Sequence, residues 1–367
     1  MKNVKKNEPL IRVSKNDAMP KHIAWIIRGI CVLAAFIVCA IVIVLITDYN
    51  PIQVFAEMFK GSFGSERKIW TAFQNTAILL CISLAVTPAF KMRFWNIGAE
   101  GQVLMGALAT AGCMITFGGV LPTPIIILIS AITSMFFGLV WGVIPASFKA
   151  KWNTNETLFT LMMNYVATQL VAYCITFWEN PKGSNTVGII NFNSEAGWIP
   201  SLFGQKYLIN ILVVLFMTIV MNIYLKKSKQ GYEISVVGES ENTAKYIGIN
   251  VKKVIIRTMA ISGAMCGVAG FLLVAGTGHT ISTNTAGGQG FTAIMVSWLA
   301  KFNPYVMMFT SFLLVFLDRG ASEIATAFRL NESVSEILSG IILFFIIGSE
   351  FFINYKISFR KNNGGNK

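Results

Sequence analysis

Apolar stretches long enough to cross a lipid bilayer follow one another along this sequence. A helix needs about 20 mainly apolar residues to span a hydrocarbon core roughly 30 Å thick, and lipid permits few other spanning structures. Nine stretches of this kind occur, at about 23–47, 69–90, 98–117, 124–145, 157–178, 206–225, 254–277, 304–318 and 334–354. The sequence therefore predicts an all-α protein that passes through a membrane many times.

A tenth apolar segment, at about 290–300, is too short to cross as a regular helix. Glycines crowd its start at 287–290, and a polar turn ending in Pro304 follows it. Non-helical backbone at membrane depth is tolerated only where protein or water surrounds it. We therefore expect a broken or re-entrant helix here, and about ten crossings in all if this segment crosses.

The composition agrees with a membrane protein and argues against other classes. Hydrophobic residues make up 54% of the chain and charged residues 13%, against about 25% charged in an ordinary soluble domain. The net charge of +13 would indicate a nucleic-acid partner only on a water-facing basic domain, which the sequence lacks. The six cysteines lie inside apolar runs and there are two histidines, so neither a metal site nor a disulfide framework is indicated.

The distribution of Lys and Arg predicts the orientation, because the cytoplasmic loops of membrane proteins carry an excess of them. With the N-terminus in the cytoplasm and ten crossings, 23 of the 30 basic residues fall inside and 7 outside. We therefore expect a multi-pass protein of the cell (plasma) membrane with both termini cytoplasmic. Its expected parts are an N-terminal tail 1–22, a transmembrane domain 23–354 with an extracellular loop 179–205, and a C-terminal tail 355–367.

The longest polar segment between two spans is 226–253, which reads KKSKQGYEISVVGESENTAKYIGINVKK and should face the cytoplasm. Gly231 and Gly238 punctuate it, and 240–247 can form a short helix with its N-cap at its first residue or at Glu239. A compact helix on this face suits the docking of a soluble partner. A solvated connector is the alternative interpretation.

Catalytic motifs are absent from the sequence. The phosphate-binding pattern Gly-x4-Gly-Lys-Ser/Thr does not occur, nor do the patterns His-Glu-x-x-His and Gly-x-Ser-x-Gly. We therefore do not expect an enzyme, and we expect no cofactor in this chain.

The segment FWNIGAEGQ at 94–102 places polar groups at the mouth of an apolar span. Polar side chains at membrane depth are costly unless they face a cavity or another helix, so Asn96, Glu100 and Gln102 are candidates for the substrate pathway. The alternative is that Glu100 caps and braces the start of its own helix, where an acid is favoured by about 0.3–1 kcal/mol.

Three residues elsewhere are further pathway candidates. Asn164 offers a donor and an acceptor about two turns into its span, and Tyr165 beside it offers a stacking face. Trp298, beside the broken segment, could stack on a base, although a tryptophan of the membrane belt or of the packed interior is the simpler interpretation.

Other singled-out residues have simpler explanations. Gly263 and Gly267 form a small-residue face suited to close helix packing within the chain. Asp318 and Arg319 are expected at a solvated helix end. His279 should lie near the outer end of its span, and a pH-sensing role would need a partner group.

Three segments together resemble a known family. The motif FWNIGAEGQ followed by VLMGA at 103–107, the segment LMMNY at 161–165, and GYE at 231–233 followed by VVGESENTAKYIGINVKK are similar to the permease subunits of ABC importers. The resemblance is to the superfamily for branched-chain amino acids and simple sugars, particularly its nucleoside (guanosine-type) branch. It covers most of residues 69–350.

The resemblance implies a function and partners. The chain would form part of the translocation pathway for nucleosides, and ATP would be hydrolysed with Mg²⁺ in a separate cytoplasmic ATP-binding subunit. A second related permease, in a heterodimer, and an extracytoplasmic substrate-binding protein would complete the importer.

In this family the cytoplasmic segment couples the permease to the ATPase. The resemblance implies that role for Gly231, Glu239, Asn242, Ala244, Tyr246 and Gly248. The family's usual Asn-Pro after the glutamate is Ser240-Glu241 here, so the docking contacts differ in detail.

Rival functions remain open at this point. A monosaccharide or a branched-chain amino acid could replace the nucleoside, because these motifs are shared more widely than the choice of substrate. An ion-coupled secondary transporter would need intramembrane carboxylates, for which Glu100 and Glu336 are available. A non-transporting membrane scaffold is the third possibility.

Overall fold

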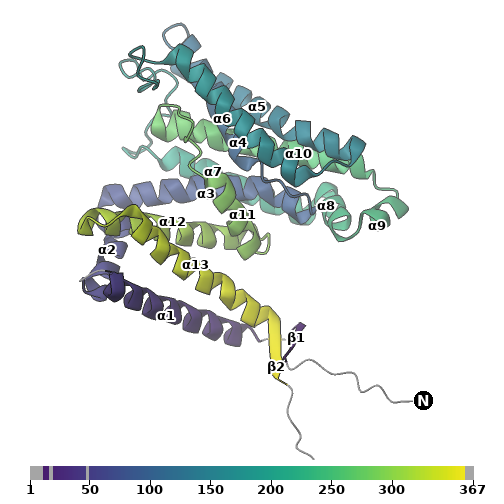
Figure 1. Cartoon of the computed structure of the whole chain (residues 1–367). Coiled ribbons are helices and arrows are strands. Elements are labelled where there is room, and N and C mark those ends of the chain that lie inside the picture. The colour runs from purple at the N-terminus through teal and green to yellow at the C-terminus, as the bar shows by residue number, and fades with distance from the viewer. Residues whose placement is uncertain (1–10, 16–19, 47–48, 360–367) are drawn as a thin grey trace, which may run out of the picture. The chain divides into compact units, whose positions relative to one another are not determined.

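The computed structural model describes residues 11–15, 20–46 and 49–359 (Figure 1). The chain divides into two compact units, one formed by Glu66–Val315 and the other by Met1–Ser65 with Phe316–Lys367. Most of the expected tails 1–22 and 355–367 lies outside the described residues.

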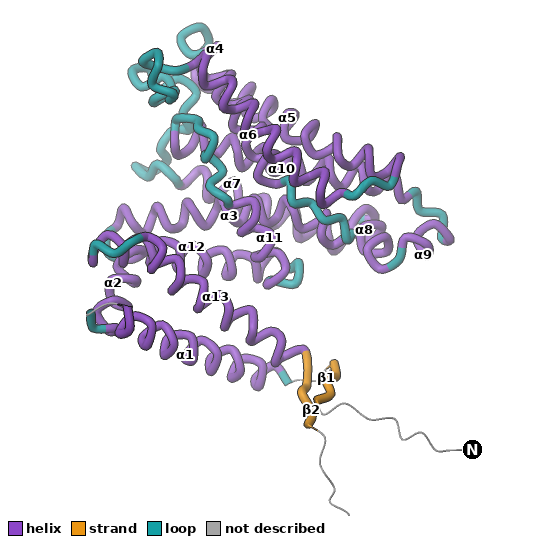
Figure 2. The backbone as a smooth tube through the Cα atoms, viewed as in Figure 1, coloured by secondary structure: helices purple, strands orange, loops and turns teal. Residues whose placement is uncertain are grey.

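The larger unit, Glu66–Val315, is built of helices and contains the motifs discussed above (Figure 2). Its elements are α3 (Glu66–Lys91), α4 (Ala99–Phe117), α5 (Thr123–Trp152), α6 (Glu156–Trp178), α7 (Leu208–Lys227), α8 (Lys229–Glu239), α9 (Glu241–Tyr246), α10 (Val251–Leu273), the π-helical turn η1 (Val274–Gly278), α11 (Gln289–Leu299) and the first half of α12 (Pro304–Phe328).

The second unit contains both ends of the chain. Its elements are β1 (Ile11–Lys15), α1 (Lys21–Ile46), α2 (Pro51–Phe63), the second half of α12, α13 (Glu332–Asn354) and β2 (Tyr355–Phe359). Helices α1 and α13 pack together, and an ion pair of 2.6 Å joins Arg28 to Glu350.

The two terminal strands form a short antiparallel ladder, in which Ile11 lies opposite Phe359 and Lys15 opposite Tyr355. The expectation of an all-α protein is therefore wrong for these ten residues. The two segments, IRVSK and YKISF, alternate apolar and polar residues, but each is only five residues long and depends on a partner more than 300 residues away. The pairing places the beginning of α1 and the end of α13 on the same side of the unit.

Eight helices in the described part of the chain are long and apolar enough to cross a membrane. They are Ile26–Ile46, Glu66–Lys91, Thr123–Trp152, Glu156–Trp178, Leu208–Lys227, Val251–Gly278, Pro304–Phe328 and Glu336–Ile353. Each overlaps one of the predicted spans. The protein is thus a mostly helical, multi-pass membrane protein.

Two predictions about helix ends are wrong. α12 continues to Phe328, so Asp318 and Arg319 lie inside a helix and not at its end. The helix continues because it packs within the smaller unit. Gly320 lies against Met58 and the backbone of Gly61, and this contact stabilises the additional helical turns.

Gly231 and Gly238 also do not interrupt the chain, because both lie inside α8. Each lies so close to a neighbouring backbone segment that a side chain at this position would clash with it. Gly231 faces the carbonyl groups at the end of α7, and Gly238 faces the carbonyl of Lys91 at the end of α3. These glycines therefore serve close packing of α8.

The core of the larger unit rests on close contact among α4, α5 and α10, which lie side by side (Figure 1). Gly263 of α10 meets Gly138 of α5, and Gly267 meets the Ser134 carbonyl of α5 and Gly106 of α4. The prediction that the Gly263-x-x-x-Gly267 face serves packing within the chain is confirmed. The close approach of the helix backbones adds dispersion attraction, and larger residues at these positions would hold the helices apart.

Candidate functional site

Two buried amides join the turn before α4 to the central helix α10. Asn96 and Gln102 pair side by side, with Gln102 Nε2 donating to Asn96 Oδ1 at 3.2 Å. Asn96 Oδ1 also accepts from the backbone N–H of Gly98 at 3.1 Å, while its Nδ2 donates to Ser262 Oγ of α10 at 3.3 Å. Both side chains are buried, with exposed fractions of 0% and 1%. Their polar atoms are thus used within the chain itself.

A third amide, Asn164 of α6, also forms hydrogen bonds at this turn. Its Oδ1 accepts from the N–H of Gly101, and its Nδ2 donates to the carbonyl of Ile97, both at 2.9 Å. Thr160, one turn earlier, accepts from the N–H of Ile97 at 3.2 Å. The turn is therefore held by side chains of three helices, α4, α6 and α10.

Glu100 bonds to a segment far away in the sequence. Its Oε1 accepts from the backbone N–H of Gly288 and its Oε2 from that of Gly290, both at 2.8 Å. These donors are at the start of α11, so Glu100 caps α11, and the interpretation that it caps its own helix α4 is wrong. A helix N-terminus offers N–H groups that lack partners within the helix, and a carboxylate satisfies two of them.

The segment before α11 confirms the prediction of a broken helix. α10 ends in the π-helical turn η1, and residues 279–288 are not helical (Figure 2). Gly287 and Gly288 have φ values of 58° and 73°, the left-handed region in which glycine is favoured. Residues 282–284, a serine, a threonine and an asparagine, are exposed.

Two of the aromatic pathway candidates have exposed side chains. Tyr165 of α6 is 62% exposed, and Trp298 of α11 is 46% exposed. Trp298 stacks on Trp95, with ring centres 5.8 Å apart and planes 25° from parallel, and Phe90 and Phe302 approach it edge-on. Trp95 was not among the candidates predicted from the sequence, although its position next to Asn96 in the FWNIGAEGQ motif could have identified it.

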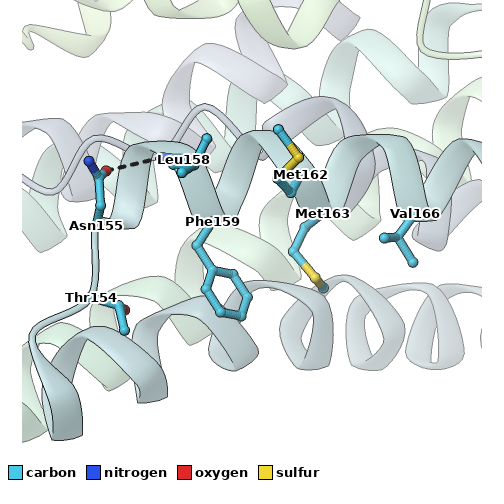
Figure 3. Close-up of a pocket in the computed structure, with 7 residues that line it drawn as sticks. All are labelled: Thr154, Asn155, Leu158, Phe159, Met162, Met163 and Val166. Atoms are coloured by element: carbon cyan, nitrogen blue, oxygen red, sulfur yellow. Dashed lines mark hydrogen bonds between the residues drawn. The ribbon is translucent and has the colours of Figure 1, made fainter.

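An open groove of about 450 Å³ lies along the first half of α6 (Figure 3). Figure 3 shows that its wall is formed mainly by Leu158, Phe159, Met162, Met163 and Val166. At its end, Asn155 uses its side-chain oxygen to cap α6 through the N–H of Leu158. The groove therefore offers an apolar surface, which suits lipid or a neighbouring helix better than a polar solute.

The 226–253 segment forms a knob made of α8 and α9, which lies at the ends of α3 and α10 (Figure 1). Ser228 caps α8 and Ser240 caps α9, the latter through the N–H of Thr243 at 3.2 Å. The predicted short helix with its N-cap at Ser240 is thus confirmed. An ion pair of 2.9 Å between Glu233 of α8 and Arg257 of α10 ties the knob to the central helix.

The six residues predicted for coupling fall into two groups. Gly231 and Ala244 are buried, whereas Glu239, Asn242, Tyr246 and Gly248 are exposed, Tyr246 to 92%. The buried side chains of the knob join one apolar cluster with the ends of the long helices, formed by Ala89, Met92, Phe94, Ala146, Ala150, Ile234, Val237, Ala244, Val251, Val254, Ile255 and Met259.

Comparison with known proteins identifies the family. Residues 69–347 match the family described as branched-chain amino acid transport system / permease component. The chain belongs to this permease family. The matched region includes all of the pathway candidates and the α8–α9 knob of the permease.

Several relatives of the permease carry functional names. It is 26% identical to the glucose ABC transporter permease protein TsgB13 of Haloferax volcanii, over 94% of its own length and 93% of the relative. It is 28% identical to the nucleoside ABC transporter permease protein NupB of Lactococcus lactis, over 86% and 89%. It is 27% identical to the guanosine ABC transporter permease protein NupP of Bacillus subtilis, over 95% and 100%.

The same two bacteria each hold a second matching permease. The nucleoside permease NupC of Lactococcus lactis and the guanosine permease NupQ of Bacillus subtilis match 59% and 57% of this chain. The chain is therefore an ABC permease with nucleoside permease homologues, and such homologues occur as pairs. ABC permease subunits are transport components and not enzymes.

The 179–205 loop of the permease packs on the π-helical turn that follows α10. Trp198 stacks on His279 with ring centres 3.7 Å apart and planes 7° from parallel. The N–H of Ile190 donates to the carbonyl of His279 at 2.7 Å, and that of Ile199 to the carbonyl of Ala275 at 2.9 Å.

Proposed function

We propose that this permease forms part of the translocation pathway of an ABC importer for nucleosides, with ATP and Mg²⁺ bound and ATP hydrolysed in separate cytoplasmic subunits. The observation that carries the proposal is the α8–α9 knob. Its exposed surface offers a docking site, and its buried residues join it to α3, α5 and α10. A displacement of the knob by the ATPase is thereby passed to the helices that surround the pathway.

The proposed topology has ten crossings and both termini in the cytoplasm. To the eight spans it adds α4, whose 19 residues reach about 28 Å, and the broken segment 279–303. The β1–β2 ladder supports an even number of crossings, because it brings the two ends of the chain together. The 23 to 7 distribution of basic residues supports a cytoplasmic position for both, in the cell membrane.

The pathway is proposed to run past the capped start of α11. Exposed non-helical backbone is tolerated inside a membrane only beside water or protein, and residues 282–284 are of this kind. Tyr165, Trp298 and Glu100 would face the solute or lie next to it. Asn96, Gln102 and Asn164 would shape the wall through the hydrogen bonds that hold the turn before α4.

The remaining partners follow from the same proposal. The occurrence of paired permeases among the relatives supports a heterodimer with a second related permease. An extracytoplasmic substrate-binding protein would dock near the 179–205 loop, where Phe203 is 89% exposed. Lipid would cover the outward apolar faces.

A monosaccharide is the second candidate substrate, because the relative TsgB13 is named for glucose and matches 94% of the chain. The aromatic pair Trp95 and Trp298 suits a nucleobase, since stacking on an aromatic face is worth about 1–3 kcal/mol per base.

Uptake by the assembled importer distinguishes the two substrates. Proteoliposomes that hold this chain with its partner permease, ATPase and binding protein are offered labelled uridine, guanosine, glucose or leucine. We expect nucleoside accumulation at least about 10-fold above the other solutes, equivalent to about 1.4 kcal/mol of discrimination. Accumulation of glucose without uridine or guanosine would contradict the nucleoside assignment and favour the sugar.

A further inference from the structure

Two lysines lie close together where the neighbouring helices α3 and α7 end. Lys91 is the last residue of α3 and is half-buried, and Lys226 is exposed in the last turn of α7, which packs against α3. The two ammonium charges are near enough to repel each other. In the described part of the chain, no carboxylate forms an ion pair with either lysine, whereas Arg257 nearby pairs with Glu233. An anion that binds between the two lysines would remove this repulsion.

A tyrosine at the start of α12 lies beside the same lysines. Lys226 Nζ is 5.9 Å from the centre of the Tyr305 ring, and Asn222 Nδ2, one turn before Lys226, donates to Tyr305 Oη at 3.4 Å. The face of an aromatic ring attracts a cation, so Tyr305 helps to hold the ammonium group in place. Tyrosine is also typical of the boundary between lipid and water, and Tyr305 is exposed.

Exposed apolar side chains lead away from these polar groups. Ile219 and Ile223 precede Lys226 by seven and three residues, a spacing that places all three on one face of α7. Phe309 lies one turn beyond Tyr305 in α12. Ile219, Ile223 and Phe309 are exposed, and we call them the apolar stripe. A cationic end above an apolar surface matches the two parts of a phospholipid, its phosphate and its acyl chains.

The α8–α9 knob rests on the same two helix ends. Gly238 of α8 faces the carbonyl of Lys91, so close that a Cβ would not fit between them. α7 ends at Lys227, and Ser228, the next residue, caps α8. A ligand that holds Lys91 and Lys226 together therefore holds the base of the knob.

We propose that Lys91, Lys226 and Tyr305 bind the phosphate headgroup of an anionic phospholipid whose acyl chains lie along the apolar stripe. The bound lipid joins the ends of α3 and α7 beneath the knob. A soluble acidic partner is a poorer match, because it would leave Ile219 and Ile223 uncovered. The proposal goes beyond the transport function and does not depend on which solute is carried.

Lipid binding to the full-length chain tests this proposal. Native mass spectrometry of the detergent-solubilised protein compares phosphatidylglycerol with phosphatidylcholine of the same acyl chains. We expect the wild type to bind phosphatidylglycerol at least about 10-fold more tightly. This preference should fall below about 2-fold in the double variant Lys91→Gln with Lys226→Gln. Lys91→Arg with Lys226→Arg keeps both charges and should keep the preference.

The matched control is the double variant Lys252→Gln with Lys253→Gln. These two lysines are also exposed at a helix end, in the first turn of α10, so the control removes the same amount of charge. It should keep the preference for phosphatidylglycerol. An equal loss in both glutamine variants would mean that any pair of lysines attracts the lipid, and would overturn the proposal. Full preference in Lys91→Gln with Lys226→Gln would overturn it as well.

Excess inorganic phosphate distinguishes a lipid site from a site for free phosphate. It should leave phosphatidylglycerol bound to the wild type, because the acyl chains add apolar contacts that phosphate lacks. If inorganic phosphate displaces the lipid completely, the charge of the headgroup alone accounts for binding, and the assignment of the site to a phospholipid is wrong.

Discussion

Replacement of Tyr246 by alanine is expected to abolish ATP-driven uptake while leaving the fold of the permease intact. Tyr246 is 92% exposed at the end of α9, where it holds no other part of the chain in place. An exposed tyrosine on a rigid knob is typical of a residue that dominates binding to a partner, where truncation costs about 2 kcal/mol or more. The affinity for the ATPase subunit should fall at least about 30-fold.

Phe203→Ala is the matched control for Tyr246→Ala. Phe203 is also an aromatic residue with 89% exposure, but it lies on the 179–205 loop. Pull-down and calorimetric titration with the purified ATPase subunit should show normal binding for Phe203→Ala and loss of binding for Tyr246→Ala. Equal ATPase affinity in the two variants would remove Tyr246 from the coupling surface.

A leucine in place of Gly267 is expected to prevent correct packing of the larger unit. Even a Cβ at this position meets the Ser134 carbonyl of α5, and it lies 3.0 Å from the Cα of Met135. Gly106 of α4 also closes on Gly267, so neither neighbour offers a flexible side chain that could move aside. Overpacking of this kind costs about 3 kcal/mol or more, because backbone must shift.

Thermal unfolding of the detergent-solubilised protein measures this effect against Gly340→Leu. Gly340 is also a helical glycine, in α13, but a Cβ there meets nothing within 4 Å. Gly267→Leu should lower the melting temperature by about 10 °C or fail to give monodisperse protein. Gly340→Leu should stay within about 2 °C of the wild type. Equal melting temperatures for the two variants would show that α5 and α10 can separate at little cost.

Most helices of this permease could be predicted from hydropathy and from their ends. The broken helix before α11 and the capped α9 also follow from local residue chemistry, because glycine and serine act on the backbone next to them. The packing face at Gly263 follows from the spacing of its small residues along one helix. The predicted end of α12 was ten residues too early, because Asp318 and Arg319 lower the hydropathy there. The helix is continued by the contact between Gly320 and α2, and this contact leaves no pattern in the sequence.

The partners of the buried polar groups could not be predicted. Polar residues at membrane depth drew attention to Asn96, Glu100, Gln102 and Asn164, but a sequence does not say which backbone each will meet. Glu100 lies 188 and 190 residues before the two glycines that it binds, so a cap on its own helix was the simpler expectation. The β1–β2 ladder could not be predicted for the same reason, because its two strands are far apart in the sequence.

The energy source of transport tests the central claim most directly. Proteoliposomes with this chain, its partner permease, the ATPase and the binding protein are loaded with ATP in the presence of ionophores that abolish proton and sodium gradients. We predict that labelled uridine accumulates, and that a non-hydrolysable ATP analogue stops it. Uptake that continues without ATP and follows an imposed ion gradient would contradict the account.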